Sequence, residues 1–119
     1  MRGSMGSDAE LAILFADVVG SSRLFEALGD ERASELVAVC VDLMRHATEE
    51  HRGRVVKTMG DEVMSTFERC DDALAAGSMM QTTIAARKDL AIDGQPSMIR
   101  IGCHFGPVVI ENRDVFGAA

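Results

Sequence analysis

The chain contains the run LAILFAD at residues 11–17, in which consecutive apolar residues end at Asp17. A short apolar run of this kind is typical of a strand that is buried on both faces. We therefore expect a central strand with the carboxylate of Asp17 at its carboxyl end.

Two helices are predicted directly after this strand. The sequence Gly20-Ser21-Ser22 is typical of a turn followed by a helix start, and Gly29 ends this short helix. Asp30 caps a longer helix, for which Gly53 supplies the end. The apolar residues of this helix recur at helical spacing and form one stripe, which comprises Ala33, Leu36, Val37, Cys40, Met44 and Ala47.

The remainder of the chain carries further strand and helix signals. Residues 54–58 and 62–67 are short strand candidates joined around Gly60, as in a tight hairpin. A helix opens at Asp71-Asp72, and a strand follows at 98–105. Gly106-Pro107 predicts a turn before a further strand at 108–111.

This order of elements predicts an α+β fold with a ferredoxin-like split βαβ core, in which an antiparallel sheet carries helices on one face. In that topology the first strand lies between the strands at 62–67 and 98–105. Asp17 and Asp61 are then expected to meet at one end of the sheet.

Composition excludes several classes of protein. The chain has 119 residues, enough for one domain of ordinary size. Its formal net charge of −7 argues against a nucleic-acid partner, because phosphates repel an acidic surface. No run approaches the roughly 20 apolar residues of a membrane span, so we expect no membrane contact within this chain.

The cysteines and the first residues give two further expectations. Cys40, Cys70 and Cys103 show no Cys-x-x-Cys spacing, which favours a reducing, cytoplasmic location over a zinc site or disulfide framework. Residues 1–8 are expected to be a tag or a disordered terminus, because Met1-Arg2-Gly3-Ser4 is typical of an expression vector. Residues 9–119 then form the domain.

Two carboxylates at one sheet end, without a lysine between them, favour a divalent cation. Mg²⁺ and Mn²⁺ take a few carboxylates together with substrate phosphate oxygens, and the carbonyl of Val18 could complete the set. Each aspartate also has a purely structural interpretation, since Asp17 could cap the next helix and Asp61 could be a hairpin residue. Glu62 is expected to point to the other side of its strand and is not counted as a ligand.

Two further features could serve a triphosphate. Gly20, Ser21 and Ser22 lie at a helix start, where backbone N–H groups attract phosphate. Arg100 is flanked by Ile99 and Ile101, so it projects from the opposite strand face and could reach a polyphosphate. Lys57 lies four residues before Asp61, on the first strand of the hairpin, and its ordinary interpretation is a solvated lysine on an edge strand.

Taken together, four blocks in this order resemble the catalytic domain of the class III nucleotidyl cyclases, the adenylate and guanylate cyclase family. The blocks are FADVVGSS at 15–22, KTMGD at 57–61, IRIGCHFGPVV at 99–109 and DVFG at 114–117. They cover nearly the whole chain after residue 8. Any single block would be a weak signal, whereas the ordered set is specific.

The resemblance implies that Asp17 and Asp61 are the catalytic carboxylates that hold two Mg²⁺ or Mn²⁺ ions per site, with Arg100 on the triphosphate. It also implies that Lys57 and Asp114 select the purine. Adenine presents an acceptor at N1 and a donor at N6, which a lysine and an aspartate match, so ATP is the expected substrate. The family pairs its catalytic domains head to tail, which implies a homodimer for the complete domain.

The chain departs from the family pattern after residue 117. The family continues with a helix that carries a transition-state arginine and an asparagine, followed by further strands. We therefore expect residues 9–119 to be the N-terminal two-thirds of the domain, without its C-terminal elements and with little turnover. One alternative is a non-catalytic cyclase homologue that dimerises or binds nucleotide, and another is a purely structural ferredoxin-like module. A third is a diguanylate cyclase-like enzyme, whose Gly-Gly-Asp-Glu-Phe signature differs at two of five positions from Met59-Gly60-Asp61-Glu62-Val63.

Overall fold

The computed structural model describes residues 7–92, 94–111 and 114–117, with side chains described for 10–92 and 94–107. Strand β1 (Ser7–Val18) leads into helices α1 (Ser21–Leu28) and α2 (Asp30–Glu50). The hairpin β2 (Arg54–Met59) and β3 (Glu62–Phe67) precedes helix α3 (Cys70–Ala86) and the 3-10 turn η1 (Lys88–Leu90). Strands β4 (Ile99–Glu111) and β5 (Asp114–Gly117) follow. The tag expected at residues 1–8 overlaps β1 at Ser7, and its first six residues lie outside the described part of the chain.

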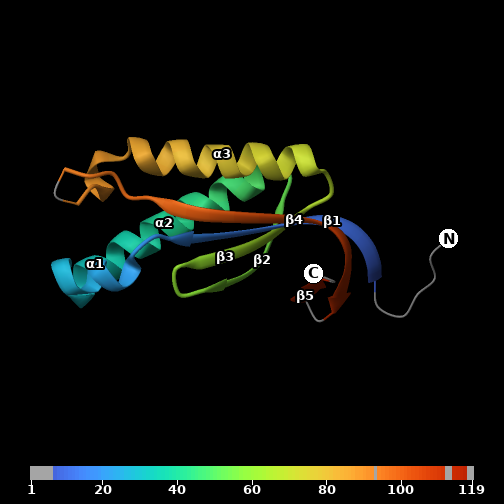
Figure 1. The fold of residues 1–119 in the computed structure, drawn as a ribbon, viewed down its shortest axis with the longest axis horizontal. Helices are drawn as coiled ribbons and strands as arrows, with labels where there is room; N and C mark the ends of the chain where they lie inside the picture. The colour runs from blue at the N-terminus through green and yellow to red at the C-terminus, as the bar shows by residue number, and fades with distance from the viewer. Residues whose placement is uncertain (1–6, 93, 112–113, 118–119) are drawn as a thin grey trace.

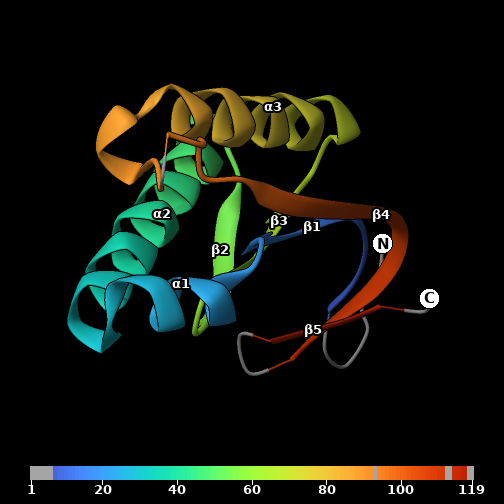
Figure 2. The ribbon, with the colours of Figure 1, turned by 60° about the vertical axis from the view of Figure 1, so that its left-hand side comes forward.

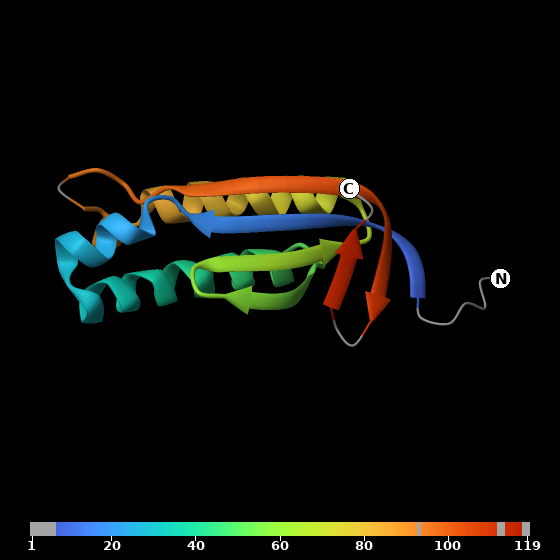
Figure 3. The same ribbon diagram turned by 60° about the horizontal axis from the view of Figure 1, so that its bottom comes forward.

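The strands form one antiparallel sheet in the order β2-β3-β1-β4-β5. The helices cover one face of this sheet (Figure 1), and the other face is open in the view of Figure 3. The α+β split βαβ fold and the central position of β1 are therefore confirmed. Among the described residues, every helix is too short or too polar to span a bilayer.

The core lies between the sheet and the helices. Alternate residues of β1, Ala12, Leu14, Ala16 and Val18, are buried on the helix side. The predicted stripe of α2 is buried there, with Val37 at its edge. The small side chains of Ala12 and Ala16 allow α2 and α3 to pack close to the sheet.

The helix α2 does not end in the way expected, with Gly53 as its terminating residue. Arg52, rather than Gly53, adopts the left-handed conformation, with φ of 64°, and the N–H of Gly53 donates to the carbonyl of Thr48 at 2.8 Å. Gly53 is required for a different reason, because a Cβ at this position would lie 2.3 Å from the ring of Phe67. The glycine therefore allows the chain to pass close over the core of the sheet.

The prediction of a turn at Gly106-Pro107 is wrong. Gly106 pairs with Leu11 and Pro107 pairs with Glu10, so β4 continues without interruption to Glu111. β1 is long enough to provide these partners because it starts at Ser7. Pro107, which lacks an N–H, lies just before Val108, where pairing with β5 begins. The start of β1 and the end of β4 curl away from the flat part of the sheet (Figure 2).

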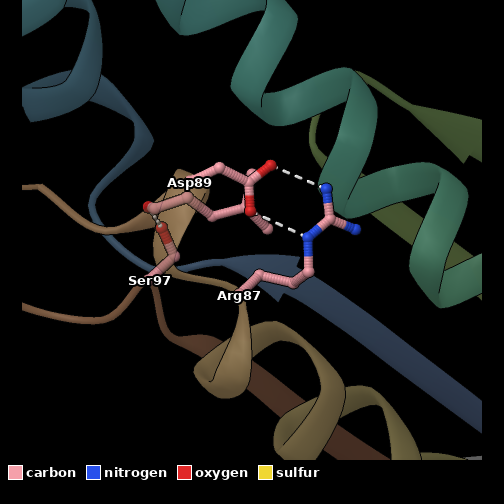
Figure 4. Close-up of polar contacts among 4 residues, drawn as sticks. Arg87, Asp89 and Ser97 are labelled. Carbon is pink, nitrogen blue, oxygen red and sulfur yellow. Dashed lines mark hydrogen bonds and ion pairs between the residues drawn. The ribbon is translucent and has the colours of Figure 1, made fainter.

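A polar clamp fixes the connection between α3 and β4 (Figure 4). Arg87 donates from Nε and Nη2 to the two carboxylate oxygens of Asp89 at 2.8 and 2.7 Å. The hydroxyl of Ser97, which is buried, donates to the carbonyl of Leu90. The N–H of Val19 then donates to the carbonyl of Met98 at 2.9 Å, so the start of β4 lies beside the end of β1.

Candidate functional site

The end of β1 and the start of β4 carry an ion pair on the open face of the sheet. Asp17 and Arg100 are direct partners in the antiparallel register. Nε of Arg100 donates to Oδ1 of Asp17 at 3.3 Å, and Nη2 donates to Oδ2 at 2.9 Å. The side chain of Arg100 is 75% exposed and that of Asp17 is 23% exposed. The carboxylate is therefore fixed more firmly than the guanidinium that covers it.

Three carboxylates act on this guanidinium. The hydrogen bonds from Arg100 to Asp17 and the charge of Asp17 raise the pKa of Arg100 above its ordinary value. The charges of Asp61 and Glu62 raise this pKa further. Because Glu62 is the partner of Asp17 in the β1–β3 register, the adjacent Asp61 lies at the same end of the sheet as Asp17.

Glu62 does not point away from Asp17, and the expectation that it would is wrong. Glu62 is the direct partner of Asp17 in the β1–β3 register, so both side chains lie on the same face. Asp17, Glu62 and Arg100 line one cavity of about 370 Å³ together with Phe15. The reason is that Asp61 belongs to the turn, and the alternation of faces starts at Glu62, the first residue of β3.

Asp61 borders a second, larger cavity. This cavity has a volume of about 570 Å³ and lies between α1, α2 and the β2–β3 turn. Its lining includes Phe25 and Val41 from the helices, Ser21 from the start of α1, and Gly60 and Asp61 from the turn. The turn that carries Asp61 and the start of α1 therefore border the same cavity.

The start of α1 has the backbone form expected for an anion site. Gly20 adopts the left-handed conformation with φ of 70°, and no side chain caps the helix. The carbonyl of Gly20 accepts from the N–H groups of Arg23 at 2.9 Å and Leu24 at 3.2 Å. The N–H groups of Ser21 and Ser22 precede these first helical bonds and belong to the positive end of the helix. Val18, whose carbonyl is a candidate metal ligand, is the last residue of β1 and pairs with Ile99.

Lys57 and Asp114 lie on strands at opposite ends of the sheet order. Lys57 is half-buried on β2, next to an irregularity in the β2–β3 pairing. Asp114 is the first residue of β5, and its backbone pairs with Glu111, while its side chain lies outside the described part of the chain. Because the sheet curls, the backbone of β5 approaches that of β2 (Figure 3).

The donor set can be compared with the needs of a divalent cation. Within the described residues, no group of three or more His, Cys, Asp or Glu side chains is arranged to enclose a metal ion. Mg²⁺ commonly binds through one or two carboxylates and takes its other ligands from water and substrate phosphates. The aspartates at this sheet end fit such an open site and do not form a protein-only cage.

The sequence of this chain is similar to those of known proteins. The family model for the adenylate and guanylate cyclase catalytic domain matches residues 4–117. A Rhizobium meliloti (strain 1021) protein with the provisional name adenylate cyclase 3 is 36% identical over 109 residues, which cover 89% of this chain and 18% of that protein. The adenylate cyclase of Streptomyces coelicolor is 34% identical over 110 residues, which cover 92% of this chain and 27% of that protein.

Solved structures agree with this assignment. The adenylate/guanylate cyclase/hydrolase of Silicibacter pomeroyi is 28% identical, with a TM-score of 0.78 over 95% of this chain and 66% of that chain. The matched residues span only 18% of the length of the Rhizobium relative and 27% of that of the Streptomyces relative. Since the family model covers nearly all of its residues, the chain belongs to the adenylate and guanylate cyclase catalytic domain family.

Proposed function

We propose that the protein containing this chain is an adenylate cyclase, which converts ATP to 3′,5′-cyclic AMP and pyrophosphate. For the chain itself we propose the binding of metal and triphosphate. The observation that carries the proposal is that Asp17 at the end of β1 pairs with Arg100 at the start of β4 and with Glu62, the residue next to Asp61, so both aspartates lie at one end of the sheet. The names of the relatives from Rhizobium and Streptomyces favour ATP over GTP.

Asp17 and Asp61 are the proposed carboxylate ligands, and the carbonyl of Val18 is a further oxygen donor at the end of β1. Two Mg²⁺ or Mn²⁺ ions, when bound, would favour ionisation of the ribose 3′-hydroxyl and neutralise charge on the triphosphate. The carboxylates orient these oxygens from a rigid sheet end, because both flanking strands are paired.

The other residues bind and orient the nucleotide. The N–H groups at Gly20, Ser21 and Ser22 lie at the positive end of α1 and suit phosphate oxygens. Arg100 offers a planar donor pair for the same oxygens. Lys57 and Asp114 provide a donor and an acceptor for the adenine edge, whereas guanine would leave one of them poorly matched.

A second protomer completes the proposed site. The helices cover one face of the sheet (Figure 3), and Asp17 and Arg100, which are direct partners in the β1–β4 register, lie on the open face. In a head-to-tail homodimer, Lys57 and Asp114 of one protomer face Asp17, Asp61 and Arg100 of the other. We also propose a cytoplasmic location, in keeping with the free cysteines at 40, 70 and 103.

Binding experiments on this chain test the metal site. We expect Mn²⁺ with ATP to bind in isothermal titration calorimetry, and Asp17→Asn and Asp61→Asn each to abolish the binding. Asp71→Asn is the matched control, because it removes an exposed aspartate at the start of α3, just beyond the end of β3 that lies opposite Asp61. Equal binding by wild type and both site variants would instead support the purely structural module.

Product analysis on the longest natural form of the protein tests the reaction. We expect cyclic AMP from ATP and at least tenfold less cyclic GMP from GTP. Metal-dependent nucleotide binding without any cyclic product would favour the non-catalytic homologue. Cyclic GMP as the main product would contradict the assignment of ATP.

A further inference from the structure

Arg100 occupies the carboxylate that the proposed function assigns to a metal ion. Both oxygens of Asp17 accept hydrogen bonds from its guanidinium, at 3.3 and 2.9 Å. A divalent cation bound to either oxygen would lie within a few ångströms of this positive charge, and the two would repel each other. The ion pair and a metal-bound Asp17 are thus competing states.

The exchange of Arg100 for a metal ion at Asp17 requires movement of the exposed Arg100 side chain. The backbone of Arg100 is held in β4 between Ile99, which is buried, and Ile101, which is partly buried. Its side chain is 75% exposed, so it can leave Asp17 without disturbing the core. Glu62 lines the same cavity and adds its charge to the surroundings of the guanidinium.

We propose that Arg100 is the resident counter-ion of Asp17, that a divalent cation reaches Asp17 by displacing it, and that the displaced guanidinium then binds the triphosphate. This inference rests on the proposed function. A metal–triphosphate complex satisfies both partners at once, because Asp17 exchanges a guanidinium for a cation and Arg100 exchanges a carboxylate for phosphate oxygens. Arg100 thereby couples metal binding to triphosphate binding.

The coupling predicts opposite effects of one substitution on two ligands. In Arg100→Gln, Mn²⁺ alone should bind roughly 3- to 10-fold more tightly than to wild type, because the competing cation is gone. Mn²⁺ with tripolyphosphate should bind at least 10-fold more weakly, because a charged phosphate donor is lost. Both affinities are measured calorimetrically on this chain, with Mn²⁺ alone and with Mn²⁺ and tripolyphosphate as the probes. No turnover is required.

Two variants separate this role from general effects. Arg69→Gln breaks an exposed Arg–Asp pair just beyond the end of β3 that lies opposite Asp61, and it should change neither affinity. Arg100→Lys keeps the charge without the planar fork and should give a Mn²⁺ affinity between those of wild type and Arg100→Gln. Thermal unfolding followed by circular dichroism checks that each variant is folded.

The outcomes distinguish the coupling from the site itself. If Arg100→Gln binds Mn²⁺ alone no more tightly than wild type does, while Asp17→Asn abolishes binding, the counter-ion role is refuted and the metal site stands. If Asp17→Asn binds Mn²⁺ as wild type does, the proposed metal site fails, and the coupling fails with it.

Discussion

Glu62 lies directly opposite Asp17 in the antiparallel pairing of β3 with β1, and both side chains border the same cavity. A carboxylate in this position adds negative potential at the proposed metal site without being required as a ligand. Removal of its charge should therefore weaken cation binding to a limited extent.

We expect Glu62→Gln to lower the affinity for Mn²⁺ by roughly 2- to 5-fold, whereas Asp17→Asn abolishes binding. Glu68→Gln is the matched control, because Glu68 is exposed just beyond the other end of β3. Calorimetric titration at low ionic strength measures the difference. An unchanged affinity in Glu62→Gln would show that its charge does not reach the bound ion.

Gly53 should not tolerate a side chain. A Cβ at this position would lie 2.3 Å from the ring of Phe67, which is 1% exposed and cannot move aside freely. We expect Gly53→Ala to lower the free energy of unfolding by about 1–3 kcal/mol, in the range for an overpacked core. Urea denaturation provides the measurement.

The control for this substitution is Gly102→Ala. A Cβ at Gly102 meets no atom within 4 Å, so we expect a change of less than about 0.5 kcal/mol. Equal destabilisation by the two substitutions would contradict the steric explanation for Gly53.

A buried hydroxyl pair joins α2 to β3. The single hydroxyl hydrogen of Thr48 is donated to the carbonyl of Met44 at 2.9 Å, so in the 3.0 Å contact between Thr48 and Ser65 the donor is Ser65. Thr48→Val then leaves the fully buried hydroxyl of Ser65 without its acceptor. We expect a loss of about 1–3 kcal/mol of unfolding free energy.

A double-mutant cycle tests this direction of donation. Ser65→Ala should cost less than Thr48→Val, because Thr48 keeps its bond to Met44. The double variant should be more stable than Thr48→Val alone, since no hydroxyl is left unpaired. Simple additivity of the two losses would show that the hydroxyls do not interact.

Cys40 gives the domain an alkaline limit of stability. Burial raises the pKa of its thiol from the ordinary 9.0 to about 11. Because the folded pKa exceeds the unfolded one, the stabilisation is complete below pH 9 and is lost as the pH rises to about 11. The loss should amount to about 2–3 kcal/mol.

We expect Cys40→Ala to remove most of this slope between pH 9 and 11, although its stability at pH 7 is lower. Cys70→Ser, at an exposed cysteine, should retain the slope. The measurement is urea denaturation at each pH. A slope that persists in Cys40→Ala would assign the alkaline limit to another group.

Much of the fold follows from local patterns. The apolar run at 11–16, the stripe of α2 and the hairpin around Gly60 each predicted an element that the structure contains. These signals are local because a helix or a hairpin is read from spacings within a few residues. The expectation of a turn at Gly106-Pro107 failed because pairing with the long β1 outweighs the local preference of glycine and proline.

The meeting of Asp17 and Asp61 at one end of the sheet was predictable from the topology, whereas the contacts of the candidate residues were not. Asp17, Asp61 and Arg100 were identified from the sequence, and the antiparallel topology brought them to one sheet end. The role of Glu62 could have been found by pairing β3 against β1 from the turn, since the residue opposite Asp17 shares its face.

The sequence by itself determined the order of elements, the family blocks and the candidate residues, because these depend on residue type and spacing along one chain. Only the tertiary structure decided that Arg100 covers both oxygens of Asp17 and that Glu62 lies beside them. The physical reason is register. A shift of one residue between β1 and either neighbour would move these side chains to the other face, and register is set by the packing of the whole sheet against α2 and α3.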